Sequence, residues 1–453
     1  MTPHHWATRL TELASRHQVP GASLAILADD EITTAATGVL NLGTGVPVTT
    51  DSVFQIGSIT KVWTATMLVQ LAGEGLLDLD APLSAVLPEL TLATPGATDQ
   101  ITVRHLLSHQ SGIDGDMFDD YGRGSDNVQR YVAGCGRLGL LHPPGATMSY
   151  CNSGFVIAGR LIEVLTGTTF DEALRARLIE PLGLARTMTN ADEAIRFRAA
   201  CGHLGTGDEQ HLAPVWALPG GAGPAGGIIA SASDILEFAR LHLAGGATAD
   251  GRQLVSAAGA AAMLTAQVDV PSYPETGRQV GLGWQLHQWD GRPLYSHNGG
   301  TIGQVSFLYV LPDRQGAVCL LTNGGQPELL YQDLFGEIFG ELWQLSLPSL
   351  AEPAPGPVPG GRELAALAGH YEREGDQIDV RVADGGLAAT FTDTSPFAQL
   401  NPDPVETLPL RPVAADVFAA RSKDDDPWGT LIFYQVGGQD YIHAGGRATP
   451  RRD

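Results

Sequence analysis

Apolar and polar residues follow patterns in the first part of the chain that predict two strands and a helix. The runs 22–27 and 31–39 carry apolar residues, and the polar pair Asp29-Asp30 between them is typical of a turn. From residue 62 to residue 71 apolar residues recur at helical spacing, and no proline or glycine occurs before Gly73. We therefore expect two edge strands of a sheet that packs against a helix beginning near residue 58.

The same patterns predict further elements as far as residue 345. Helices are expected where apolar residues share one face or recur at helical spacing: 5–14, 153–166, 234–243 (with Ser231 and Ser233 as candidate caps) and 327–345. Antiparallel strands are expected at 281–286, 294–297, 304–310 and 317–321. The sequence thus predicts a mixed α/β (α+β) fold, an antiparallel sheet flanked by helices with an additional all-helical region.

A proline-rich segment divides the chain. Residues 347–361 contain five prolines and no helical or strand period, which indicates a semi-rigid linker. Short strand-like runs with regular turns follow it, beginning at 369–372 and continuing at 377–382, 387–391, 430–435 and 440–443. We expect one domain over residues 1–346, a linker over 347–361 and a small antiparallel β-barrel over 362–453.

Charge and composition narrow the partners. The 453 residues are 43% hydrophobic, enough for a large core, and carry a net charge of −23, which disfavours nucleic acid and anionic membranes. No secretory signal or membrane-spanning run is evident, so we expect a cytoplasmic protein. The four cysteines have no metal-ligand spacing, and no cofactor motif is present. We therefore expect no cofactor and no metal.

Ser58 and Lys61 are candidates for nucleophilic chemistry. They lie three residues apart where an extended segment gives way to a helix, so the Lys61 amine can reach the Ser58 oxygen. A buried lysine has a lowered pKa and can accept the serine proton. Alone, this spacing is weak evidence, because a helix cap followed by an exposed lysine gives the same pattern.

Two further motifs strengthen the case. Tyr150-Cys151-Asn152 opens a helix-like segment, and His297-Asn298-Gly299-Gly300 lies between two strand-like runs. Serine with lysine three residues on, then Y-x-N, then a basic residue-x-Gly, resembles the serine β-lactamase and penicillin-binding-protein superfamily, in its class C and esterase-like branch. The resemblance covers residues 5–345.

This resemblance implies roles for the motif residues. Tyr150, as a phenolate or through Lys61, would shuttle the proton taken from Ser58, and Asn152 would hold the substrate amide and help to fix Lys61. The amides of Ser58 and Gly300 would form the oxyanion hole, with Gly299 allowing close approach of the acyl group. His297 departs from the lysine of lactam-processing relatives. Because histidine is largely neutral at pH 7, we expect weak or absent β-lactamase activity.

Other residues near these motifs have competing interpretations. His105 and His109 lie in a segment that resembles the family's L-L-x-H-x-S-G turn, and we favour a structural role for them. We also interpret Cys151 as a small packing residue rather than a nucleophile. The polar segment 114–130 is equally well a lid over the site or an ordinary surface loop.

The whole architecture most resembles the penicillin-binding-protein-type thioesterases of nonribosomal peptide pathways, which carry a C-terminal lipocalin-like domain. The resemblance implies that a peptidyl carrier protein delivers a peptidyl thioester to Ser58. The peptide would leave as a head-to-tail macrolactam, with a D-configured C-terminal residue. Arg447 is a candidate for binding peptide carbonyls, although an exposed C-terminal arginine is an equal alternative.

Two other functions remain open. A serine hydrolase of the same fold, an esterase or D-amino-acid peptidase, would share every motif residue. A non-catalytic peptide-binding module is the second alternative, although the presence of Ser58, Lys61 and Tyr150 together argues against it. The sequence does not determine the oligomeric state, or the length and residues of the substrate peptide.

Overall fold

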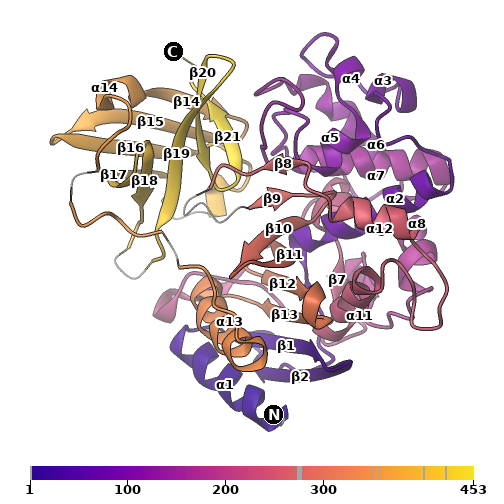
Figure 1. The fold of residues 1–453 in the computed structure, drawn as a ribbon. Coiled ribbons are helices and arrows are strands. Elements are labelled where there is room, and N and C mark those ends of the chain that lie inside the picture. Colours follow the sequence, from indigo (N-terminus) through magenta and orange to yellow (C-terminus); the bar gives the residue numbers. More distant parts are fainter. Residues whose placement is uncertain are drawn as a thin grey trace.

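The computed structural model describes residues 3–272, 278–349, 351–356, 358–400, 403–423 and 426–452. It contains a large unit built on an eight-stranded sheet, and a smaller eight-stranded barrel lies beside this unit (Figure 1). In Figure 1 the barrel lies on the side where β8 and β9 form the edge of the large sheet.

The large sheet is antiparallel, in the order β2-β1-β13-β12-β11-β10-β9-β8. Its strands are β1 (Gly21–Ala28), β2 (Glu31–Gly38), β8 (Val268–Asp269), β9 (Gln279–Val280), β10 (Gln285–Trp289), β11 (Arg292–Gly300), β12 (Val305–Leu311) and β13 (Gly316–Thr322). The first strand therefore pairs with the last, β1 with β13, in a register that sets Leu24 opposite Leu320. Strands from the beginning and the end of the large unit therefore lie side by side in the sheet.

Alternation along the strands divides the interior into two cores. Leu24 and Ile26 of β1 face a core shared with α1 (Pro3–Arg16) and α13 (Pro327–Trp343). Ala25 and Leu27 face the opposite core, shared with α2 (Thr60–Gly73) and α11 (Ala232–Leu243). A strand buried on both faces explains why residues 22–27 read as a continuous apolar run.

Helices and short strands inserted between β2 and β8 form the rest of the large unit. They are β3 (Phe54–Gln55), α3 (Leu83–Val86), α4 (Ala97–Gln100), α5 (Val103–Leu107), α6 (Asn127–Gly134), α7 (Asn152–Thr166), α8 (Phe170–Leu174), β4 (Thr187–Met188), α9 (Ala191–Ala194), β5 (His203–Leu204), β6 (His211–Leu212), α10 (Gly223–Gly226), β7 (Ile229–Ala230) and α12 (Ala257–Met263). Long α7 packs at their centre, against α2, α6 and α10. The predicted mixed fold, with a helical region beside an antiparallel sheet, is confirmed.

Some predicted elements differ in detail. Residues 281–286 are not one strand, because Gly283 has a φ of +81° and the chain turns there between β9 and β10. Ser231 caps α11 by accepting from the Asp234 amide, whereas Ser233 does not cap this helix. Helix α13 ends at Trp343 rather than at 345, because Gln344 adopts a left-handed conformation.

The barrel strands follow chain order from β14 to β21. They are β14 (Gly369–Arg373), β15 (Asp376–Ala383), β16 (Gly386–Asp393), β17 (Val405–Ala414), β18 (Val417–Ala420), β19 (Gly429–Val436), β20 (Gln439–Ala444) and β21 (Arg447–Pro450), after the short helix α14 (Leu364–Leu367). A bridge between Tyr371 and Arg451 brings the two ends of the sheet together. The predicted small antiparallel barrel is confirmed, with strands β17, β18 and β21 that the sequence patterns did not indicate.

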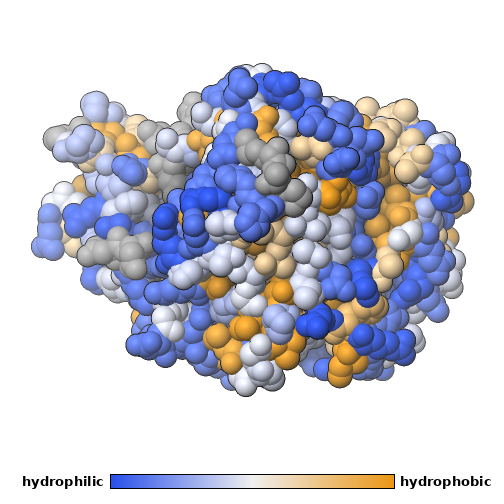
Figure 2. Space-filling model, turned by 90° about the horizontal axis from the view of Figure 1, so that it is seen from below, coloured by the Kyte–Doolittle hydropathy of each residue, from blue (hydrophilic) through white to orange (hydrophobic). Residues whose placement is uncertain are grey.

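Every helix in the described part of the chain is too short or too polar to cross a membrane. Figure 2 shows one face of the molecule, on which hydrophilic residues predominate and hydrophobic residues form smaller areas. The exposed large hydrophobic side chains are spread along the chain and include Leu76, Ile195 and Val405.

Candidate active site

Ser58 lies in a single 3-10 turn, Gly57–Ile59, between β3 and the start of α2. Gly57 has a φ of +51°, and a Cβ atom there would lie 2.7 Å from the Gly300 nitrogen. Gly299 is equally constrained, since a Cβ would lie 1.9 Å from the Ile56 carbonyl oxygen. These two glycines allow β11 to lie directly against the serine turn, where the Gly300 backbone adjoins Gly57, the residue before Ser58.

Lys61 lies in the first turn of α2 with its side chain fully buried. Its Nζ is 3.0 Å from Ser58 Oγ, and an N–H donates to the Ala225 carbonyl at 2.7 Å. Burial, helped by the Arg447 cation, lowers the pKa of Lys61 to about 7, although the Asp116 carboxylate opposes this shift. A substantial neutral fraction at pH 7 makes Lys61 chemically able to accept the serine proton.

Two cationic side chains, those of Lys61 and Arg447, lie close to the Tyr150 ring. Lys61 Nζ is 4.9 Å from the ring centroid, and Arg447 Cζ is also 4.9 Å from it. Desolvation raises the pKa of the Tyr150 hydroxyl well above its ordinary value, although a hydrogen bond with Ser58 and the Arg447 charge oppose this. Tyr150 is therefore a neutral phenol at pH 7. This favours proton transfer through Lys61 over a resting phenolate.

His109 supports the Tyr150 segment. Its ring stacks on the Tyr150 ring with centroids 4.2 Å apart, and its Nδ1 accepts from the Cys151 amide at 3.0 Å. Burial lowers the pKa of His109 well below its ordinary value, so the ring is neutral. His105 forms a capping box with Thr102 at the start of α5. Both histidines make the loop-fixing contacts that the sequence suggested, but the contact of His109 with Tyr150 was not foreseen.

Cys151 and Asn152 form the start of α7. The buried Cys151 sulfur accepts from the Gly154 amide at 3.2 Å, and burial raises the pKa of the thiol to about 12, which suits a packing role. Asn152 Nδ2 donates to Asp116 Oδ1 at 2.7 Å. Within the described residues, Lys61 bonds to Ser58 and Ala225 rather than to Asn152. The expected hydrogen bond from Lys61 to the Asn152 amide oxygen is not among those of the described residues, and the Asn152 N–H is directed at Asp116.

His297 lies on β11 and is buried on the side of Lys61. Its Nδ1 donates to the Asn298 carbonyl at 2.6 Å, and burial, together with the nearby Lys61, lowers the pKa of the ring to about 3. The ring centroid is 6.3 Å from that of Tyr150. His297 is therefore neutral at pH 7 and offers no permanent cation to a substrate carboxylate.

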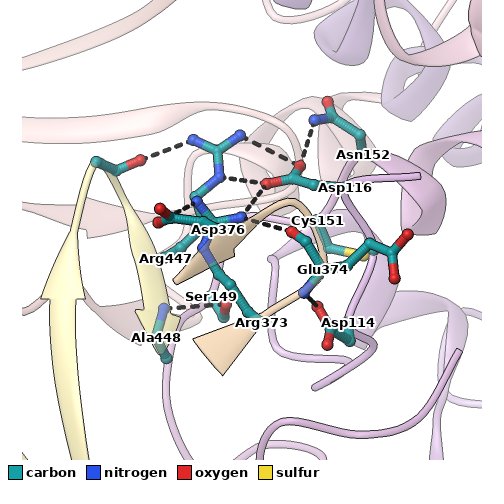
Figure 3. Close-up of polar contacts among 12 residues, drawn as sticks. Asp114, Asp116, Ser149, Cys151, Asn152, Arg373, Glu374, Asp376, Arg447 and Ala448 are labelled. Carbon is teal, nitrogen blue, oxygen red and sulfur yellow. Dashed lines mark hydrogen bonds and ion pairs between the residues drawn. The ribbon is translucent and has the colours of Figure 1, made fainter. Parts of the chain in front are cut away.

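The barrel makes direct hydrogen bonds to Ser149 and Asp116 of the large unit (Figure 3). The Tyr150 amide donates to the Gly446 carbonyl at 2.9 Å, and the Ala448 amide donates to Ser149 Oγ at 3.1 Å. Arg447 between them donates from Nε to Asp116 Oδ2 at 2.7 Å. Its side chain is only 25% exposed, so the alternative of an exposed C-terminal arginine is wrong.

The segment that follows α5 lies between this site and the barrel. Asp114 accepts from the Glu374 amide at 2.8 Å, and the rings of Phe118 and Phe397 lie 5.1 Å apart. Arg137 pairs with both Asp119 and Glu374, at 2.6 and 3.0 Å. These contacts join residues 114–119 to the barrel, and the lid interpretation of residues 114–130 stays a prediction. Asp116 on this segment was not recognised as a site residue, because no local motif marks it.

The site has no evident metal-binding set. The described ranges contain no group of three or more histidine, cysteine or acidic side chains arranged to hold a metal ion. The structure gathers in one region all the site residues that the sequence predicted, although they are distant in sequence. They are Ser58, Lys61, Tyr150, Asn152, His297, Gly299, Gly300 and Arg447. They provide a nucleophile, a base with a lowered pKa and backbone amides, which is the equipment for acyl transfer through serine.

Comparisons with known proteins agree with this geometry. Penicillin-binding protein 4 of Amycolatopsis lactamdurans is 46% identical over 376 residues, which are 82% of this chain and 98% of that protein. A D-aminopeptidase of Gluconobacter oxydans is 26% identical over 84% of this chain and 69% of its own length. The crystal structure of SurE aligns with a TM-score of 0.79 and 29% identity over 99% of each chain. The beta-lactamase family model matches residues 6–339, and the chain therefore belongs to the beta-lactamase family.

Proposed function

We propose that the protein takes a linear peptidyl thioester onto Ser58 and releases it as a head-to-tail macrolactam. The observation that carries the proposal is that the barrel forms one wall of the site, through Gly446 and Arg447 around Tyr150. Such a wall limits the access of water to an acyl-enzyme and leaves room for a folded peptide to react with itself.

In the first half-reaction Lys61, in its neutral form, accepts the Ser58 proton as Oγ attacks the thioester carbonyl. The oxyanion is held by the Ser58 and Gly300 amides, where one donor typically stabilises the transition state by about 3 kcal/mol. The carbon–sulfur bond then breaks, and the pantetheine thiolate leaves with the proton that Lys61 or Tyr150 returns. The product of this step is a peptidyl ester of Ser58.

In the second half-reaction the peptide's own N-terminal amine attacks the ester carbonyl. The amine loses its proton to neutral Lys61, directly or through the Tyr150 hydroxyl, and Ser58 leaves as the alcohol with the proton that Lys61 returns. His297, whose pKa is about 3, assists only by accepting a hydrogen bond from the amine. We assign Asn152 and Gly299 to the acyl segment of the peptide, and we assign to a peptide carbonyl the Arg447 N–H groups that do not donate to Asp116. A peptidyl carrier protein would deliver the substrate.

A cavity beside the site suits a peptide side chain. It measures about 220 Å³, and its lining residues are Asp120, Arg123, Val215, Ala217, Leu218, Pro219, Gly220 and Ile302 of the large unit and Pro396, Phe397, Gln399 and Leu400 of the barrel. Leu218 in its wall contacts the Gly226 position, which in turn adjoins Gly57. A further crystal structure of SurE, which aligns with this chain at a TM-score of 0.77, contains D-Leu. We therefore propose that this chain also selects a D-configured residue at the peptide C-terminus.

A serine hydrolase that releases linear acids is the alternative, and similarity to a D-aminopeptidase favours it. We do not expect β-lactam hydrolysis, because His297 is neutral and gives no permanent cation for the drug carboxylate.

Mass spectrometry of products separates these functions. Linear peptidyl thioesters ending in D- or L-residues are incubated with the wild type and with Ser58→Ala. A cyclic product from D-ending substrates that is absent with the variant supports the cyclase. Linear acid alone, again dependent on Ser58, makes the protein a hydrolase. A fluorophosphonate probe that fails to label Ser58 would favour a non-catalytic binding module.

A further inference from the structure

Asp116 lies where the catalytic site meets the barrel, and it accepts hydrogen bonds from both sides (Figure 3). Oδ1 accepts from Asn152 Nδ2 at 2.7 Å. Oδ2 accepts from Arg447 Nε at 2.7 Å and from Arg373 Nη1 at 2.8 Å. The carboxylate therefore joins the first residue of α7 to two arginines of the barrel strands β14 and β21.

The surroundings of Asp116 keep it ionised. Its side chain is only 11% exposed, and burial alone would raise its pKa. The two arginines and the Asn152 amide outweigh burial and hold the pKa of Asp116 below its ordinary value. Arg373 is itself anchored in the barrel, through Asp376 at 3.0 Å and the Glu374 carbonyl at 3.1 Å. The barrel thus presents a fixed arginine to the carboxylate.

These contacts determine how two site residues are oriented. A carboxylate only accepts hydrogen bonds, so Asn152 must direct its N–H at Asp116 and keeps its amide oxygen for another group. The pairing with Asp116 also holds Arg447 at 4.9 Å from the centre of the Tyr150 ring. Both effects depend on the barrel being in place.

We propose that Asp116 is a positioning residue through which the barrel orients Asn152 and holds Arg447 against Tyr150. The barrel is then part of the catalytic machinery and not only a cover. The inference rests on the Ser58 acylation chemistry of the proposed function, and it is independent of whether the acyl group is later cyclised or hydrolysed.

The charges around Lys61 provide a readout that a merely structural role would not move. The Asp116 carboxylate raises the pKa of Lys61 and the Arg447 cation lowers it, while the adjoining Cys151, His109, His297 and Tyr150 are neutral. Lys61 must be neutral to act as a base, so acylation rises as the pH passes through its pKa. Removing the Asp116 charge lowers that pKa and moves the rising limb to lower pH.

The test uses the full-length chain and an activated p-nitrophenyl ester, and it measures the burst of p-nitrophenol that reports acylation of Ser58. Asp116→Asn is expected to slow the burst by up to about 100-fold through misplacement of Asn152, and to shift the rising limb downward. Added to Asn152→Ala, it should cause little further loss, because both changes remove the same interaction.

Asp119→Asn is the matched control on the same loop, since it breaks an exposed pair with Arg137 and does not touch Asn152. It is expected to acylate within about twofold of the wild type. The proposal is overturned if Asp116→Asn keeps the burst rate and the pH dependence of the wild type. It is also overturned if Asp119→Asn loses as much of the burst rate as Asp116→Asn. If Asp116→Asn fails to fold, Arg373→Met replaces it, and an unchanged burst in that variant has the same meaning. A burst that persists in Ser58→Ala would instead refute the proposed function.

Discussion

Two groups of residues make up the candidate site, and they differ in how the chain brings them together. Ser58 and Lys61 are three positions apart on one helical turn, so local geometry places the amine near the hydroxyl. Asp116 and Arg447 are 331 positions apart and meet only because the barrel docks on the loop after α5. The first group provides the chemistry of acyl transfer. The second controls the orientation and electrostatics of the first, so changes to it should tune the reaction rather than abolish it.

The strongest test of the local group is Lys61→Met. Removing the base is expected to slow acylation of Ser58 by roughly 1000-fold, without lowering the unfolding temperature, because methionine suits a buried position. The burst assay and thermal unfolding measure the two effects. Lys423, the other lysine of the sequence, gives the matched control Lys423→Met, which should be silent. Retained acylation in Lys61→Met would assign the base to another residue.

Gly57→Ala tests whether the close approach of the serine turn to β11 matters. The new Cβ would meet the Gly300 backbone at 2.7 Å and requires a positive φ, so we expect a loss of about 1 to 3 kcal/mol of stability. Displacement of Ser58 from Gly300 should slow acylation by up to about 100-fold.

Gly75→Ala is the control for this change. Gly75 also has a positive φ, +77°, but nothing lies within 4 Å of its added Cβ. It should lose about 1 kcal/mol of stability and keep its acylation rate. Equal rate losses in the two variants would show that the Gly300 contact is unimportant.

Arg447→Met tests the interdomain group through pH. The cation lowers the pKa of Lys61, which is about 7, so its removal should raise that pKa and move the rising limb of acylation to higher pH, by up to about one pH unit. This shift is opposite in sign to that expected for Asp116→Asn. A pH series of the burst rate measures it, with Arg411→Met on exposed β17 as the control. If the rising limb moved in the same direction in Arg447→Met and in Asp116→Asn, the electrostatic account would be contradicted.

Cys151→Ser should have the smallest effect. A serine oxygen can accept from the Gly154 amide at the start of α7 as the sulfur does, and the thiol, with a pKa of about 12, is not a nucleophile at pH 7. We expect acylation within about twofold of the wild type. A large loss, together with protection from thiol reagents by substrate, would require a role for this sulfur.

The motif residues were predictable because each carries a local signature. Ser58 and Lys61 share a helix face, and Tyr150 and Asn152 open a helix, so their spacing indicates both structure and chemistry. Asp116 and His109 have no such signature. His109 acts through ring stacking on Tyr150, and Asp116 acts through arginines of another domain. Strand β17 was missed for a related reason, since its prolines and exposed positions obscure a strand pattern that only pairing with β16 and β18 stabilises.

By itself, the sequence determined the mixed fold, the C-terminal β-barrel and the candidate nucleophile with its base. These follow from periodicities and spacings that act within a few residues. Only the tertiary structure decided that β1 pairs with β13, that Lys61 is buried enough for its pKa to fall to about 7, and that Arg447 reaches Asp116. Burial and long-range charge pairing depend on which distant surfaces meet, and no local pattern encodes that choice.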